Sequence, residues 1–159
     1  MLIIRVPLRI SLGGGGTDLF KWYSKFGSFL ITATINKFIY ITLSRRNLDK
    51  DFWLSYSKIE NLKDKKKIKH SIIKKVLLKN PKLQNLEIHT ISEVPSNSGL
   101  GSSGSLSVGL MQALNFLSNR KISPKLLSEK SVDIEMKINK KNAGKQDQYA
   151  AAYGGLIKL

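Results

Sequence analysis

The chain has 159 residues, of which 42% are hydrophobic and none is cysteine, and its formal net charge is +16. This length suits a single domain with its own core, and the lack of cysteine excludes disulfides and thiolate metal sites. No apolar run approaches the roughly 18 residues that a membrane span needs, and the N-terminal stretch is too short and interrupted for a signal peptide. We therefore expect a cytoplasmic protein with no membrane partner.

Much of the positive charge lies between Lys58 and Lys82. A basic face of this kind can bind nucleic acid or an anionic membrane surface. The same stretch carries apolar residues at helical spacing, and no aromatic residues alternate with the lysines as base stacking would require. We therefore interpret Lys66–Lys79 as a helix whose lysines face solvent, and we expect nucleic acid not to be the partner. Structural roles are expected for His70 and His89.

The chain begins with an expected strand at Ile3–Leu12, placed at a sheet edge because Pro7 interrupts it. The segment GGGGTD at Gly13–Asp18 suits a tight turn against backbone or a ligand. Its final threonine or aspartate is placed to cap a short amphipathic helix at Phe20–Phe26, and Gly27 would end that helix.

Further strands are expected in the middle of the chain. The β-branched run Ser28–Leu43 is either one long strand or two strands bent near Asn36–Lys37. A short strand follows at Phe52–Tyr56. The alternating run Leu86–Ser92 is another strand, and it leads into the glycine-serine segment Pro95–Ser105.

Helices dominate the last third. A helix follows the glycine-serine segment, and Ser123–Pro124 begins another that runs to about Ile138, with Leu126 among its apolar positions. The loop Asn139–Gly144 precedes a short helix between Gly144 and Gly155, and Leu156–Leu159 resembles the beginning of a strand. We predict an α+β domain with a mixed or mainly antiparallel sheet and helices on one face.

The segment Pro95–Ser105 reads PSNSGLGSSGS and lies between an expected strand and an expected helix. This order places free N–H groups and the positive end of a helix dipole at one point, which suits phosphate. Ser102 and Ser103 add hydroxyls that can cap the helix, bind phosphate oxygens or ligate magnesium. The loop lacks the lysine of the GxxxxGK[ST] motif. Phosphate binding and ordinary helix capping both remain open on the loop alone.

Two further polar groupings lie where packing does not require them. Arg9 precedes the GGGGTD segment, and Glu135 and Asp147 lie near the end of one expected helix and within the next. A pair of acids in this arrangement can place one carboxylate on a metal and the other on a hydroxyl proton. Taken singly, Glu135 is more typical of a solvated helix surface.

Together, the segments RVPLRISLGGGGTD, PSNSGLGSSGS and GKQDQYAAAYGG resemble motifs of the GHMP kinase family, in the expected order and spacing. The first and last resemble the sugar-phosphate branch of that family. The resemblance implies the family's N-terminal fold, similar to ribosomal protein domain 2. It also implies transfer of the γ-phosphoryl group of ATP to a sugar hydroxyl, with the anomeric hydroxyl of heptose 7-phosphate as first choice, and ATP and Mg²⁺ as cofactors.

The resemblance also implies roles for individual residues. Asp147 matches the catalytic base, Arg9 a basic residue near the reacting phosphoryl group, and Glu135, with softer spacing, a magnesium ligand. Ser103, together with Ser102, would contact Mg²⁺ and the phosphates. The other nucleotide contacts would come from the same loop, at Pro95, Ser98, Gly99, Leu100, Gly101 and Gly104. Sugar contacts would come from Gly15, Gly16, Thr17, Asp18, Gln146, Gln148 and Tyr149.

Members of the family are about twice as long as this chain. The resemblance therefore implies that residues 1–159 form the N-terminal ATP-binding domain without the C-terminal domain, so that transfer by this chain alone would be inefficient. A separate C-terminal half or a homo-oligomer is then a candidate partner. The alternative function is a non-catalytic basic binding domain, either a kinase remnant or a nucleic-acid-binding module.

Overall fold

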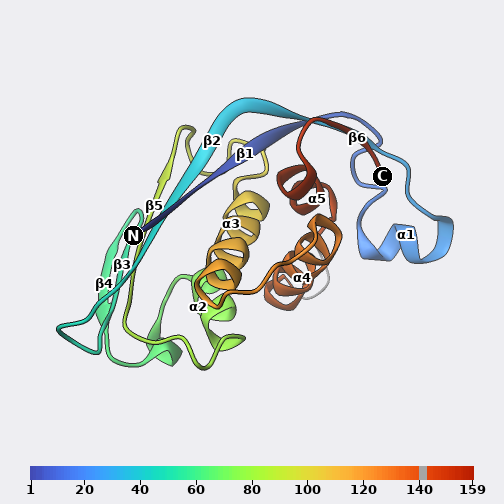
Figure 1. Cartoon of the computed structure of the whole chain (residues 1–159). Helices are drawn as coiled ribbons and strands as arrows, with labels where there is room; N and C mark the ends of the chain where they lie inside the picture. Colours follow the sequence, from blue (N-terminus) through green and yellow to red (C-terminus); the bar gives the residue numbers. More distant parts are fainter. Residues whose placement is uncertain (140–142) are drawn as a thin grey trace.

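The computed structural model describes residues 1–139 and 143–159 and shows a curved sheet with helices α2 to α5 on one face (Figure 1). The sheet order is β1-β2-β5-β3-β4, and β6 also pairs with β2. The strands are β1 (Leu2–Gly13), β2 (Ile31–Arg45), β3 (Phe52–Ser55), β4 (Ile59–Leu62), β5 (Leu86–Ser92) and β6 (Leu156–Lys158). All pairs are antiparallel except β3 with β5. The predicted α+β class, sheet type and one-sided helices are confirmed.

The long strand β2 is the centre of the sheet, because it pairs with β1 along one edge and with both β5 and β6 along the other. It is one continuous strand. Its register against β1 shifts between Pro7 and Leu8, where Asn36 and Lys37 are the unpaired residues on β2. Pro7 lies on an edge strand at this irregularity, as a residue without an N–H should.

The helices are α1 (Phe20–Phe26), α2 (Ser71–Leu78), α3 (Ser102–Leu117), α4 (Pro124–Ile138) and α5 (Gln146–Tyr153), with a short 3₁₀ turn at Lys65–Lys67. Ser123 caps α4 as predicted, since its side chain accepts from the Leu126 N–H. No helix in the described part of the chain is both long and apolar enough to cross a membrane.

Three local predictions are wrong. Neither Thr17 nor Asp18 caps α1, because the N-cap is Leu19 and no side chain bonds there. Helix α2 begins only at Ser71, because the lysines at the predicted start belong to the 3₁₀ turn Lys65–Lys67 instead. Leu126 is 43% exposed, since it lies on the outer side of the first turn of α4. The predicted loop Asn139–Gly144 lies partly outside the described residues.

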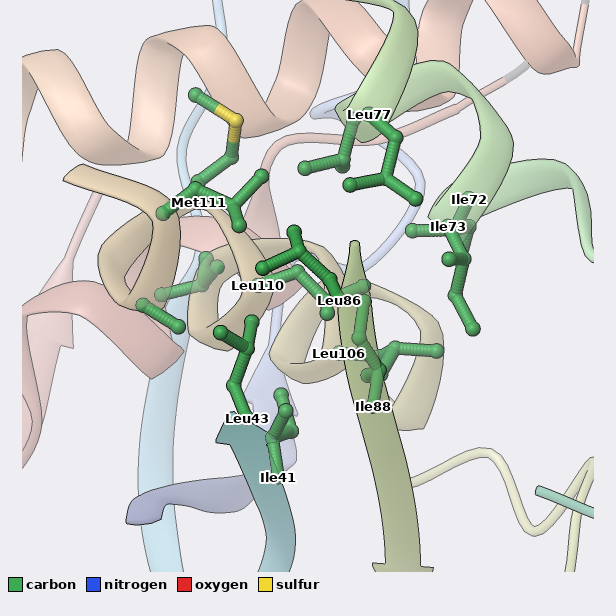
Figure 2. Packing of buried hydrophobic residues seen from close by; sticks show 14 of the residues in the cluster. Ile41, Leu43, Ile72, Ile73, Leu77, Leu86, Ile88, Leu106, Leu110 and Met111 are labelled. Carbon is green, nitrogen blue, oxygen red and sulfur yellow. The ribbon is translucent and has the colours of Figure 1, made fainter. Parts of the chain in front are cut away.

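Helix α3 fills the concave face of the sheet and packs against β1, α2, α4 and α5. Because neighbouring elements surround α3, this helix has apolar residues on several sides rather than along one stripe. Gly109 allows α3 to approach the sheet closely, because a Cβ there would lie 2.5 Å from Ile41 Cδ1 and 2.6 Å from Val6 Cγ2. Elsewhere on the same helix, its side chains pack with those of β2, β5 and α2 in one buried cluster (Figure 2). This packing fixes the N-terminus of α3 relative to β1.

Candidate active site

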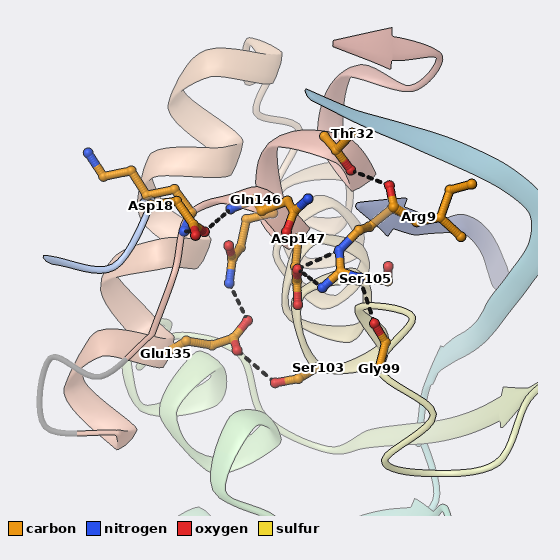
Figure 3. Close-up of polar contacts among 12 residues, drawn as sticks. Arg9, Asp18, Thr32, Gly99, Ser103, Ser105, Glu135, Gln146 and Asp147 are labelled. Carbon is orange, nitrogen blue, oxygen red and sulfur yellow. Dashed lines mark hydrogen bonds and ion pairs between the residues drawn. The ribbon is translucent and has the colours of Figure 1, made fainter. Parts of the chain in front are cut away.

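Arg9 and Asp147 form an ion pair that joins the first strand to the last helix (Figure 3). Arg9 donates to Asp147 Oδ1 from Nε at 2.8 Å and from Nη2 at 2.5 Å. Its Nη1 donates to the Gly99 carbonyl at 2.6 Å, and its backbone N–H donates to the Leu100 carbonyl at 3.0 Å. Arg9 therefore holds the glycine-serine loop and the acid of α5 together, although the three segments are far apart in sequence.

The glycines of the loop allow this close approach. Gly101 has φ +81° and is the N-cap of α3, and a Cβ there would lie 3.1 Å from Arg9 Cγ. At Gly104 a Cβ would lie 2.4 Å from Asp147 Cβ. Because α3 begins at Ser102, the N–H groups of its first turn have no intrahelical acceptor and point toward the loop. The loop thus presents a positive helix end beside Arg9 and Asp147.

Glu135 is a buried carboxylate within the same site. It accepts from Ser103 Oγ at 2.7 Å and from Gln148 Nε2 at 2.7 Å (Figure 3). Burial raises the pKa of Glu135, and the negative charge of Asp147 raises it further, while the two hydrogen bonds act in the opposite direction. The solvated helix position considered for Glu135 is therefore wrong.

Asp18 is also buried, at 6% exposure, and its carboxylate binds the beginning of α5. Oδ2 accepts from the N–H groups of Lys145 at 2.8 Å and Gln146 at 3.0 Å, and Oδ1 accepts from the Gly16 N–H at 3.2 Å. A Cβ at Gly144 would lie 2.1 Å from Asp18 Oδ2, so this position needs glycine. The GGGGTD segment therefore anchors the helix that carries Asp147.

These side chains line a cavity of about 350 Å³. Its lining includes eight of the predicted site residues: Arg9, Gly16, Asp18, Ser103, Glu135, Gln146, Asp147 and Gln148. Within the described chain, Gln146 Nε2 and Gln148 Oε1 are buried and have no hydrogen-bond partner. Buried polar atoms are rarely left unpaired, so both atoms are available to a polar ligand in this cavity, which we call the acceptor cavity.

A second cavity, of about 430 Å³, borders the loop, and we call it the donor cavity. Its lining runs from the loop to the first turn of α2: Ile39, Tyr56, Ser57, His70, Ile72, Thr90, Ile91, Ser92, Ser96, Asn97, Ser102, Ser103 and Leu106. Ser102 Oγ is buried and has no partner in the described part of the chain. Ser103 lines both cavities, so they meet at its side chain.

Some predicted contacts lie elsewhere. Thr17 Oγ1 donates to the carbonyls of Gly14 and Phe29, and the ring of Tyr149 stacks on Tyr153. Gly15, Thr17 and Tyr149 do not line the acceptor cavity. Six of the predicted nucleotide contacts line neither cavity: Pro95, Ser98, Gly99, Leu100, Gly101 and Gly104. Their contacts with ligands stay predictions, without support from the cavity linings.

The sequence reasoning missed the end of the donor cavity away from the loop, where Tyr56 and His70 lie, and it missed Asn97 within the loop itself. It also missed Glu60, a buried carboxylate on β4 that accepts from Tyr56 Oη at 2.6 Å. Among these residues, only Asn97 carried a signal in the sequence. Asparagine is among the residues that tolerate positive φ, and Asn97 has a φ of 63° in the loop.

The oxygen donors of the site suit a hard cation such as Mg²⁺. Within residues 1–139 and 143–159 no three acidic or histidine side chains gather as a complete metal cage. Ser103 and Glu135 nevertheless place a hydroxyl and a carboxylate 2.7 Å apart at the junction of the cavities. Magnesium in kinases is held by one or two carboxylates together with substrate phosphates, so an incomplete protein ligand set fits that ion.

A glycine-rich helix start, an arginine and two buried or ion-paired acids can supply the positioning and the charge that phosphoryl transfer needs. Residues 66–155 match the family model described as GHMP kinases N terminal domain. The chain is also 32% identical, over 164 residues, to D-glycero-alpha-D-manno-heptose 7-phosphate kinase of Campylobacter jejuni. The chain therefore belongs to the GHMP kinase family, as the resemblance of its motifs predicted.

Solved structures agree with this assignment. A D-glycero-D-manno-heptose 1-phosphate kinase from Bacteroides thetaiotaomicron superposes with a TM-score of 0.89 at 28% identity, covering 99% of this chain and 55% of that one. A Lactococcus lactis galactokinase complexed with galactose has a TM-score of 0.78 at 24% identity, over 99% of this chain and 44% of that one, and shows the fold alone. The Campylobacter alignment covers 95% of this chain and 48% of the relative, so the chain spans about half the relative's length.

Proposed function

We propose that this chain forms the nucleotide-binding and catalytic half of a sugar-phosphate kinase, which transfers the γ-phosphoryl group of MgATP to a sugar hydroxyl. The observation that carries the proposal is the junction of the two cavities at Ser103, directly beside Glu135 and the Arg9–Asp147 pair. A nucleotide in the donor cavity would place its terminal phosphate at this junction, and a sugar in the acceptor cavity would meet it there.

The nucleotide phosphates would lie against the N-terminus of α3. The free N–H groups of its first turn and the helix dipole favour an anion, and the unpaired Ser102 Oγ supplies a hydroxyl. Ser103 and Glu135 would hold Mg²⁺ together with the phosphates. When bound, that ion neutralises charge on the β- and γ-phosphates.

Asp147 would act on the sugar hydroxyl. Arg9 occupies Oδ1 of Asp147, which leaves Oδ2 without a partner in the described chain. In the transfer, the sugar oxygen forms a bond to the γ-phosphorus, the bond from that phosphorus to the β–γ bridging oxygen breaks, and the hydroxyl proton passes to Asp147. Arg9 would neutralise the charge that develops on the transferred group.

The relatives and the cavity support a class of acceptor. The Campylobacter and Bacteroides proteins named above are heptose phosphate kinases. The unpaired amides of Gln146 and Gln148 suit a ligand with several hydroxyls. We propose the anomeric hydroxyl of heptose 7-phosphate as the acceptor, because an anomeric hydroxyl is more acidic than an ordinary alcohol.

The proposal is tested by binding first and turnover second. Millimolar MgATP should raise the Tm of the chain, because a ligand that binds only the folded state stabilises it. A coupled ADP-release assay across sugar phosphates should give its highest rate with heptose 7-phosphate, and Asp147→Asn should abolish that rate while keeping the Tm shift. If MgATP leaves Tm unchanged while mixed-sequence RNA binds with a steep salt dependence, the chain is a basic binding domain instead.

A further inference from the structure

The donor cavity has two polar ends separated by apolar side chains. At the loop end lie Ser102 and Ser103, where the proposed function places the phosphates, and at the other end lie Tyr56 and His70. The apolar residues that line the cavity are Ile39, Ile72, Ile91 and Leu106. A nucleotide whose phosphates occupy the loop end would extend toward Tyr56 and His70, with a planar base lying on the apolar side chains.

His70 is held in a fixed position at that far end. Its backbone N–H donates to Glu60 Oε1 at 3.4 Å, and the N–H of Lys69 donates to Glu60 Oε2 at 2.9 Å. Tyr56 Oη donates to the same carboxylate, and the rings of Tyr56 and His70 meet edge to face at 4.8 Å. The proposed triphosphate site uses neither Glu60 nor Tyr56, so this network serves to position the far end of the cavity.

The imidazole of His70 has an unused nitrogen. Nδ1 is buried and has no hydrogen-bond partner in the described part of the chain, and it does not cap α2 although His70 is the N-cap residue. Burial lowers the pKa of His70 despite the nearby Glu60 carboxylate, so the ring is neutral at pH 7. A neutral ring that lines a cavity with an unpaired nitrogen can bond a neutral polar group of a ligand.

We propose that His70 reads the base of the donor nucleotide, through a hydrogen bond between Nδ1 and the polar edge of the base. This inference rests on the proposed function, because it takes the loop end of the donor cavity as the phosphate site. It adds that the chain distinguishes a nucleoside triphosphate from a bare polyphosphate, and that this discrimination depends on His70 rather than on the loop.

The test compares the affinities of MgATP and magnesium tripolyphosphate, measured by titration of the intact chain. His70→Phe removes Nδ1 and keeps an aromatic ring against Tyr56. It should weaken MgATP about three- to tenfold, the usual worth of one hydrogen bond, and leave tripolyphosphate unchanged. His70→Asn, which keeps a polar group close to the position of Nδ1 and suits an N-cap, should retain affinity for MgATP within about twofold of the unmodified chain.

Two controls separate the base from the phosphates. His89 bonds Glu87 on β5 and does not line the donor cavity, so His89→Phe should change neither affinity. Ser102→Ala should weaken both ligands equally. If MgATP and tripolyphosphate bind but His70→Phe binds MgATP as the unmodified chain does, or weakens both ligands alike, the role of His70 is wrong and the triphosphate site stands. If neither ligand binds the unmodified chain, the proposed function fails and the inference fails with it.

Discussion

The roles of some residues in this site could be predicted from the sequence, and the roles of others could not. Arg9 and Asp147 were predicted from motifs, and the structure pairs them at 2.5 Å. Asp18 was predicted as a sugar contact, but its carboxylate accepts three backbone N–H groups, two of them from the start of α5. Glu60 gave no signal, because a single acid in a lysine-rich stretch has no pattern that indicates burial. The role of Asp18 had no local pattern either, because the N–H groups of Lys145 and Gln146 that it binds are far from it in sequence.

The buried carboxyl group of Glu135 makes the folding stability of the protein depend on pH. Because burial raises the pKa of this carboxyl in the folded state, its protonated form is favoured by folding. The stabilisation is fully present below the unfolded pKa and is lost as pH rises through the folded pKa. Glu135→Gln keeps the shape and an acceptor for Gln148, so we expect it to raise Tm at pH 7, with the gain disappearing as pH approaches 4.

Melting curves of both proteins between pH 4 and pH 8, without divalent metal, check this expectation. Glu129→Gln is the matched control, because Glu129 lies on the same helix and is exposed, and it should change Tm little at any pH. A Glu135→Gln protein that melts lower than the unmodified chain at pH 7 would show that hydrogen bonding outweighs burial. In the proposed function, the same variant should also lose the part of the MgATP effect that depends on Mg²⁺.

Among the elements, strands were easier to predict than helix beginnings. The long β2 and its irregularity at Asn36–Lys37 follow from β-branched residues interrupted by a polar pair. The start of α2 was placed several residues early, because lysines have good helix propensity. Local preference cannot detect that the Glu60 carboxylate accepts from the backbone N–H groups of Lys69 and His70, directly before Ser71. Tertiary contacts decided that boundary.

The attachment of α5 to the GGGGTD segment gives a prediction for Asp18. Asp18→Asn cannot accept equally well from the N–H groups of Lys145 and Gln146, so unfolding free energy should fall by about 1–2 kcal/mol, the loss typical of a helix cap. Amide hydrogen exchange at residues 145–148 should accelerate. Ser123→Ala, which removes the cap of α4, is the control and should leave exchange at 145–148 unchanged. Unaltered exchange in Asp18→Asn would contradict the anchoring role.

The packing of α3 against α5 gives a second prediction at this scale. In Gly104→Ala the new methyl group would lie 2.4 Å from Asp147 Cβ and 3.1 Å from backbone atoms of α5, so one helix must move. We expect a loss of about 1–3 kcal/mol in urea denaturation, as for other overpacked sites, together with weaker turnover. Gly13→Ala has open space around its Cβ and should change stability by less than about 0.5 kcal/mol. Equal stability of the two variants would refute the close contact.

For the whole molecule, the motifs predicted the family, and the order of the elements predicted an α+β class with helices on one face of the sheet. The large positive charge did not predict a partner. The buried residues of α2, namely Ile72, Ile73, Val76 and Leu77, face the core, which is the arrangement expected for lysines that only solvate a helix. What the sequence could not supply is the junction at Ser103, because two cavities that share one side chain depend on how α3 packs on the sheet.

The exposure of this junction gives a prediction about rate. Ser103 is exposed, and the side chain of Asp147 is 26% exposed, so water reaches the point where the proposed transfer occurs. Solvent access weakens electrostatic stabilisation and permits hydrolysis. The chain also spans only about half the length of its Campylobacter relative. We therefore expect this chain to bind MgATP, but its sugar-dependent release of ADP should be on the order of a hundredfold slower than that of the relative, since misplacement of about 1 Å can cost this much.

Parallel ADP-release assays of the two proteins, with heptose 7-phosphate as acceptor, measure the difference. The remaining half of the Campylobacter relative, added as a separate polypeptide, should raise the rate of this chain, and Asp147→Asn should remain inactive in the mixture. The same rate in both proteins without any addition would mean that the described residues shield the reaction well enough on their own. In that case, the bound substrates would have to cover Ser103 and Asp147 and exclude water from them.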